Sequence, residues 1–174
     1  MSKSPAVTGA NAVSHGTGTV ILCDSSSSMD LPAALGRSRI MSLREALQQV
    51  ATPQHKLLAF ASDVVTLSSP HDLPEPSGGT DLARGLAAAA EHNPAAVIVI
   101  TDGEPNSPKA AIAAAGRVSG KIDVIFCGDP ADLAAIRFCG MLARIGGGRM
   151  LRHDWSLTPS LAAPIRLLLG GPTT

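Results

Sequence analysis

The chain has 174 residues, which is enough for one domain with a substantial buried core. Its 14 basic and 14 acidic residues give a formal net charge of zero, so no overall field favours DNA, RNA or an anionic membrane as a partner. Aromatic residues make up only 2% of the chain and Tyr is absent, which argues against the aromatic platforms that bind single-stranded nucleic acid.

The N-terminal residues 1–16 are mostly small and polar, and they contain no apolar segment of the kind that a signal peptide needs. No uninterrupted apolar run elsewhere in the chain is long enough to cross a bilayer. We therefore expect a short disordered leader at 1–16, a single domain at 17–170 and a tail at 171–174. A cytoplasmic location is the expectation that follows from these features.

Apolar runs and helical patterns alternate through the rest of the chain. Residues 19–23 form a continuous β-branched and apolar run, and residues 95–101 form the strongest strand pattern. The runs at 56–60 and 64–67 are separated by only three residues, which favours a tight hairpin. Strands are predicted at 19–23, 56–60, 64–67, 95–101, 122–127 and 149–152, and helices at 40–50, 81–92, 108–118, 131–145 and 157–169.

Strands that alternate with helices predict an α/β fold with a doubly wound, mostly parallel six-stranded sheet. The hairpin adds one antiparallel edge strand, and the helices flank the sheet. In such folds a ligand binds beyond the carboxyl ends of the strands, where the winding reverses direction. Functional residues are therefore expected directly after the strand at 19–23 and after the strand at 95–101.

Polar segments follow both of these strands. Residues 24–28 read Asp-Ser-Ser-Ser-Ser, and residues 101–104 read Thr-Asp-Gly-Glu. A third segment, Ser-Gly-Gly-Thr-Asp at 77–81, ends a loop rich in Pro, Ser and Gly and opens the second helix. Its two glycines allow a close approach of the backbone. Gly103 is interpreted as a backbone requirement of the turn that contains it.

The side chains of these segments form a set of oxygen donors. Asp24, Ser26 and Ser28 alternate, so in an extended turn they can converge on one point. Thr80 offers a hydroxyl at the start of a helix, and Asp102 ends the strand next to the one that ends in Asp24. Two carboxylates and three hydroxyls, without His or Cys, predict a site for a hard divalent cation such as Mg²⁺.

The order DxSxSM, then GGTD, then an apolar strand ending in TDGEP resembles the metal-ion-dependent adhesion site of von Willebrand factor A (vWA) domains. The predicted order of strands and helices is similar to that Rossmann-like fold along nearly all of the chain. Carried over by position, the resemblance implies that Ser26, Ser28 and Thr80 are hydroxyl ligands. It implies that Asp24 and Asp102 hold the ion directly or through water. The expected cofactor is Mg²⁺, with Mn²⁺ and Ca²⁺ as alternatives.

The resemblance also implies a function. Intracellular vWA domains of the stand-alone, bacterial or phage type act as adaptors, in which a partner's Asp or Glu completes the shell of the bound ion. Such relatives work beside AAA+ ATPases of the MoxR or chelatase type, or in stress-resistance operons such as the tellurite group. We therefore expect a metal-dependent protein-interaction module that is not an enzyme.

Two alternatives stay open. One is a Mg²⁺-dependent phosphohydrolase of the haloacid-dehalogenase type, with Asp24 as nucleophile. That chemistry needs a second acid two residues later, where this chain has Ser26. Neither a GxSxG nor a GxxxxGK[ST] motif is present. The other alternative is a vWA scaffold that binds partners through its surface without a metal.

Overall fold

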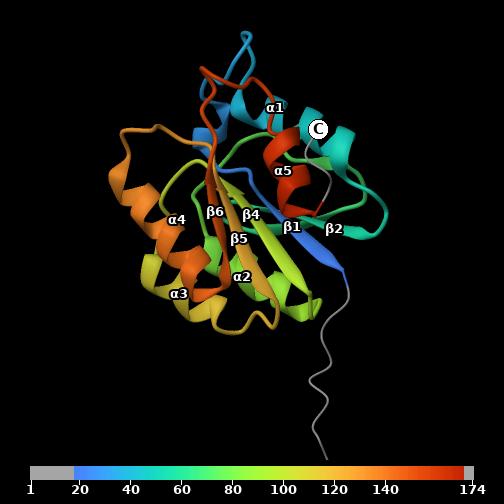
Figure 1. The fold of residues 1–174 in the computed structure, drawn as a ribbon, viewed down its shortest axis with the longest axis vertical. Helices are drawn as coiled ribbons and strands as arrows, with labels where there is room; N and C mark the ends of the chain where they lie inside the picture. The colour runs from blue at the N-terminus through green and yellow to red at the C-terminus, as the bar shows by residue number, and fades with distance from the viewer. Residues whose placement is uncertain (1–17, 171–174) are drawn as a thin grey trace, which may run out of the picture.

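The computed structural model describes residues 18–170, whose strands form one six-stranded sheet in the order β3-β2-β1-β4-β5-β6 (Figure 1). The expected leader at 1–16 and the tail at 171–174 lie outside the described residues. Neighbouring strands are parallel except for the hairpin of β2 and β3. The strands are β1 (Thr19–Asp24), β2 (His55–Phe60), β3 (Val64–Leu67), β4 (Ala96–Thr101), β5 (Lys121–Phe126) and β6 (Gly147–Arg152).

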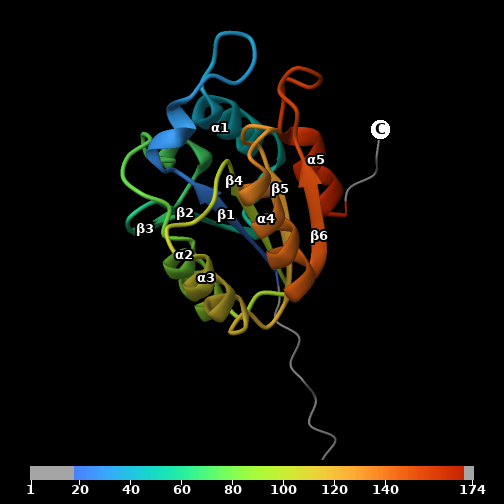
Figure 2. The same ribbon diagram turned by 90° about the vertical axis from the view of Figure 1, so that its left-hand side faces the viewer.

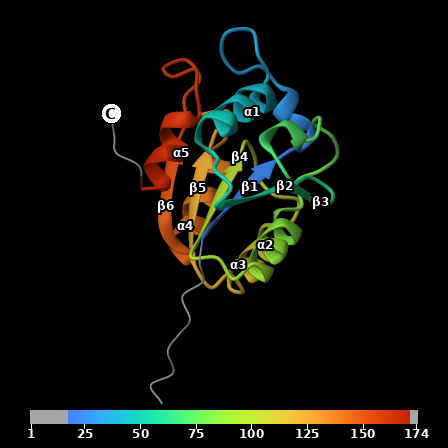
Figure 3. The ribbon, with the colours of Figure 1, turned by 90° about the vertical axis from the view of Figure 1, so that its right-hand side faces the viewer.

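Helices cover both faces of this sheet. Helices α2, α3 and α4 pack on one face, and α1 and α5 pack on the other. Figures 2 and 3 view the molecule from opposite sides and show α1 and α5 together, away from α2 and α3. The helices are α1 (Arg39–Val50), α2 (Leu82–Glu91), α3 (Pro108–Ala115), α4 (Leu133–Ile145) and α5 (Ala162–Leu168), with 3-10 turns η1 (Ser27–Asp30) and η2 (Pro70–Asp72). Of the helices within residues 18–170, none combines the length and apolar character that crossing a bilayer requires.

The core consists of two apolar layers, one on each face of the sheet. In β4, Val97 and Val99 pack in the layer that contains α2, α3 and α4, whereas Ile98 and Ile100 pack in the layer that contains α1 and α5. A strand buried on both faces needs an apolar residue at every position. This is why the central strands read as continuous apolar runs rather than as alternating patterns.

The predicted α/β fold is confirmed, and so is each predicted strand and helix; the ends are shifted in all of them except the strand at 64–67. The largest shift is at the last helix, which begins at Ala162 rather than at residue 157. The amides of Leu157 and Thr158 both donate to the carbonyl of Asp154, which closes a turn instead of a helix. Pro159 then follows without an amide donor of its own.

The winding of the sheet reverses between β1 and β4. The chain leaves β1 through α1 and reaches β2 on one side, and after β3 it returns through α2 to β4 on the other side of β1. In the parallel register of the two central strands, Cys23 lies beside Ile100. The residues that end β1 and follow β4 therefore meet at one edge of the sheet, which is where ligands bind in folds of this class.

Candidate metal centre

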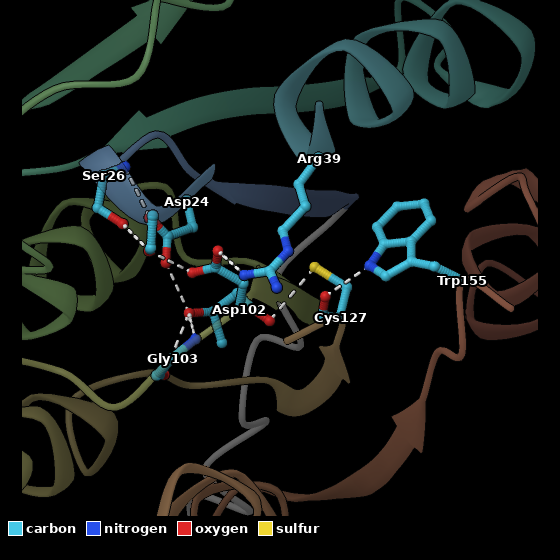
Figure 4. Close-up of polar contacts among 9 residues, drawn as sticks. Asp24, Ser26, Arg39, Asp102, Gly103, Cys127 and Trp155 are labelled. Atoms are coloured by element: carbon cyan, nitrogen blue, oxygen red, sulfur yellow. Dashed lines mark hydrogen bonds and ion pairs between the residues drawn. The ribbon is translucent and has the colours of Figure 1, made fainter. Parts of the chain in front are cut away.

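Four of the five predicted ligand residues lie in one hydrogen-bonded chain at this edge (Figure 4). The amide of Ser26 donates to Asp24 Oδ1 at 2.8 Å. The hydroxyls of Ser26 and Ser28 lie 3.2 Å apart, and the Ser28 hydroxyl donates to Asp102 Oδ1 at 2.6 Å. Asp24 and Asp102 come from neighbouring strands, and the tight turn after β1 places the two serines between them.

Thr80, the fifth predicted ligand, is joined to this group through its backbone. Its amide donates to Asn106 Oδ1 at 3.0 Å, and its carbonyl accepts the Asn106 amide at 2.9 Å. Asn106 lies in the loop that follows Asp102, so these two hydrogen bonds join the loop of Thr80 to the loop of Asp102. Within residues 18–170, the Thr80 hydroxyl makes no hydrogen bond to the other four side chains. The structure thus places the loop of Thr80 at the site but does not bring its hydroxyl into the hydrogen-bonded chain.

The loop before Thr80 is also tied to the serine turn. The amide of Ser27 donates to the carbonyl of Gly78 at 3.2 Å, and the Ser27 hydroxyl donates to the same carbonyl at 3.1 Å. Gly78 has a φ of +70°, and a Cβ there would lie 2.5 Å from the Ser62 hydroxyl. Glycine is therefore favoured at this position by the backbone conformation, and a larger residue would also displace the Ser62 hydroxyl.

Asp24 is completely buried and is held by two donors. Besides the Ser26 amide, it accepts a hydrogen bond from the Thr101 hydroxyl, at 2.6 Å from Oδ2. Burial raises the pKa of Asp24 from 3.8 to about 6, and these hydrogen bonds oppose the rise. A carboxylate that has lost its hydration in this way is stabilised by a cation placed beside it. Thr101 is not among the predicted ligands, although it belongs to the TDGEP motif.

Asp102 makes an ion pair that the sequence does not predict. Its Oδ2 forms an ion pair with Arg39 Nη1 at 2.7 Å, and Figure 4 shows Arg39 extending from α1 to the carboxylate. Arg39 is the first residue of α1, and its side chain is only 12% exposed. The two residues are 63 positions apart, and no local pattern connects them.

The donors at this edge fit a small, hard cation. The 3.2 Å between the Ser26 and Ser28 hydroxyl oxygens is close to the ~3 Å that separates adjacent ligands in an octahedron with Mg–O bonds of about 2.1 Å. Among residues 18–170, no group of three or more His, Cys, Asp or Glu side chains is placed to hold a metal. A cation that fits these donors would contact the hydroxyls of Ser26 and Ser28.

A cavity of about 360 Å³ lies beside the site, with Arg39, His153 and Trp155 in its wall. The rings of His153 and Trp155 pack edge to face, with centroids 4.3 Å apart. His153 is 8% exposed, and within the described residues its Nε2 is buried without a hydrogen-bond partner. Burial lowers the pKa of His153 below 6.5, although Asp154 and the backbone of Thr158 partly oppose this.

Acidification is expected to destabilise the wild-type protein relative to a His153→Phe variant. Because the pKa of His153 is lower in the folded state, the unfolded chain takes up more protons as the pH falls below 6.5. The stability that the neutral ring provides is present above that pH and is lost as the pH falls towards the folded-state pKa. Urea denaturation between about pH 7.5 and pH 5.5 measures the difference. Replacing the exposed His92 by Phe is the control. If the difference in unfolding free energy between the wild type and His153→Phe is the same at both pH values, the expectation is wrong.

No family model and no curated protein sequence matches the chain. Among solved structures, a von Willebrand factor type A protein from Catenulispora acidiphila is similar, with a TM-score of 0.67 and 20% sequence identity. The match covers 87% of this chain and 41% of that one. The Deinococcus radiodurans RO (RSR) protein matches with a TM-score of 0.43 and 21% identity, over 75% of this chain and 34% of that one. The chain thus spans less than half the length of either structure.

Proposed function

The chain has a vWA-like fold, and we propose that it is a metal-dependent protein-interaction module. In this proposal an acidic residue of a partner protein binds at a divalent cation, with Mg²⁺ the best match to the donors. The observation that carries the proposal is the hydrogen-bonded chain from Asp24 through Ser26 and Ser28 to Asp102 at the carboxyl edge of the sheet. That edge is where the winding of the sheet reverses.

Each residue of the site has a role in this proposal. Ser26 and Ser28 would contact the ion directly, and the loop locked at Thr80 borders the same space. Asp24 and Asp102 would balance its charge from fixed positions, because hydrogen bonds from their neighbours already orient both carboxylates. A bound Mg²⁺ supplies positive charge that neutral hydroxyls leave largely unquenched, and this charge attracts a carboxylate.

The same residues support binding better than hydrolysis. A phosphohydrolase that used Asp24 as nucleophile would need an acid–base group close to the leaving oxygen. The residue two positions later is Ser26, whose hydroxyl cannot take that role, and the nearby Asp102 carboxylate is already held by Ser28 and Arg39. A partner with an accessible Asp or Glu, in the class of AAA+ ATPases or their substrates, is the proposed ligand.

An affinity experiment tests the proposal with Mg²⁺ as the variable. The wild-type protein, used as bait in cell extract, is expected to capture a partner in Mg²⁺ and to release it in EDTA. Ser28→Ala is expected to lose the capture because it removes one hydroxyl donor and the hydrogen bond to Asp102. Ser27→Ala is the matched control, since Ser27 is exposed and its hydroxyl donates to the Gly78 carbonyl, which keeps its hydrogen bond from the Ser27 amide in the variant.

Capture that survives both EDTA and Ser28→Ala would overturn the metal bridge and support the metal-free scaffold. Turnover of a phosphoester such as p-nitrophenyl phosphate that requires Mg²⁺ and Asp24 would instead support the hydrolase.

A further inference from the structure

The guanidinium of Arg39 is a positive charge built into the candidate metal centre. Its Nη1 lies 2.7 Å from Asp102 Oδ2, and the Asp102 side chain is fully buried. Within the described residues, Arg39 Nε is also buried and has no hydrogen-bond partner. Removing a cation from water is unfavourable unless a counter-charge is close, and here Asp102 supplies that charge.

The position of Arg39 is fixed by the loop that connects the serine turn to α1. The amide of Arg39 donates to the carbonyl of Leu31 at 3.0 Å, directly after η1. The intervening loop closes on itself, because Ala33 and Arg37 are joined by a hydrogen bond of 2.8 Å. Figure 4 shows Cys127 and Trp155 beyond the guanidinium. The side chain is thus held between the serine turn and the neighbouring strand ends, unlike a mobile surface arginine.

Among the ion pairs of residues 18–170, the one between Arg39 and Asp102 is the most buried; the carboxylate of the Lys121–Asp123 pair is also fully buried, but its lysine side chain is 43% exposed. The side chains of Arg37 and Glu45 are 41% and 42% exposed, and those of Arg84 and Asp63 are 57% and 84% exposed. Water and salt screen such exposed pairs strongly. Water and salt screen the charge of Arg39 less, so it acts more strongly on an ion beside Asp102 than the exposed arginines do.

From this geometry we infer that Arg39 is a resident counter-ion of Asp102 that lowers the affinity of the site for divalent cations. The inference rests on the proposed function, because it concerns the same site. The two carboxylates carry two negative charges, and Arg39 already cancels one of them. An entering Mg²⁺ therefore meets a weaker attraction and a repulsive neighbour. Arg39 thereby sets the cation concentration at which the site fills.

Titration calorimetry with Mg²⁺ alone tests this inference. Arg39→Gln, which removes the charge, is expected to lower the dissociation constant for Mg²⁺ at least about tenfold, because a guanidinium and a divalent ion about 6 Å apart repel one another by that much even in bulk water. Arg39→Lys keeps the charge and is expected to stay within about twofold of the wild type. Arg37→Gln is the matched control, because it changes the net charge equally but removes only an exposed pair with Glu45.

The outcomes separate this inference from the proposed function. If the wild type and Arg39→Gln bind Mg²⁺ equally, or the variant binds more weakly, the role of Arg39 is overturned and the metal site stands. If neither protein binds Mg²⁺, both ideas fail. Binding by Arg39→Gln but not by the wild type supports the inference in its strongest form. Circular dichroism establishes that each variant is folded. Arg39→Met keeps the aliphatic part of the side chain and removes the charge, and it is expected to lower the dissociation constant for Mg²⁺ as Arg39→Gln does.

Discussion

Replacing Asp24 by Asn is expected to leave the protein folded in EDTA and to abolish the thermal stabilisation that we expect Mg²⁺ to give the wild type. An ion that binds only the folded state stabilises it by about 2.7 kcal/mol at a hundred times its dissociation constant. For a domain of this size that corresponds to a rise in melting temperature of roughly 5–10 °C. Asn keeps the shape of Asp24 but not its charge, so the rise is expected to disappear.

The same variant has a second expected effect, of opposite sign, when no metal is present. Burial raises the pKa of Asp24 to about 6 in the folded protein, from 3.8 for an ordinary Asp. The folded state therefore binds more protons between these values, and the stability of the wild type in EDTA falls as the pH rises through this range. Asn has no charge to bury, so near neutral pH in EDTA the variant is expected to melt at or above the wild-type temperature.

Differential scanning fluorimetry, with and without Mg²⁺, measures both effects. Asp30→Asn is the matched control, since Asp30 is an exposed carboxylate in the same turn and its loss changes the net charge equally. This control is expected to retain the rise with Mg²⁺. A full rise in Asp24→Asn would show that the ion binds somewhere else.

Gly128→Ala is expected to destabilise the domain by about 2–4 kcal/mol and to remove the response to Mg²⁺. A Cβ at this position would overlap the backbone carbonyl of Asp102, and it would lie 2.7 Å from Phe126 Cζ. Neither neighbour can move freely, because one is backbone and the other is a ring buried in the core. The strain would therefore act directly on the segment that positions Asp102.

Gly103→Ala provides the comparison, because Gly103 adjoins the same aspartate. A Cβ at Gly103 would have no atom within 4 Å, and its φ is not among the positive ones. The expected change in the free energy of unfolding is within about 0.5 kcal/mol. Urea denaturation measures both variants. Equal stabilities would contradict the expectation. The interpretation of Gly103 as a backbone requirement is wrong, because its φ is not positive and it has open space. Of the two glycines beside Asp102, the one without room for a side chain is Gly128, which follows β5.

Local patterns in the sequence were enough to predict the architecture and most of the residues at the site edge. The apolar runs of β1 and β4 are long and uninterrupted, and the rule for doubly wound sheets then places Asp24 and Asp102 together. The start of α5 was not predictable in this way. Leu157 lies at helical spacing before Leu161, but it is 81% exposed and belongs to a turn.

Contacts between distant segments could not be predicted for a different reason. The ion pair of Arg39 joins the start of a helix to the end of a strand, and it depends on how the loop before α1 is closed. The close approach of Gly128 to the Asp102 carbonyl depends on the pairing of β5 with β4. Each involves residues that no periodicity relates, so only the folded chain reveals them.

The two borders of the sheet have consequences for how other chains can approach it. β6 carries the exposed Arg149 and Arg152, and its register against β5 is shifted by a bulge. β3, at the opposite border, has only four residues. Charges, bulges and short strands are the devices by which natural proteins prevent a strand of another chain from pairing with an edge. Growth of the sheet by strand addition, and the aggregation that follows from it, is therefore disfavoured at both sides.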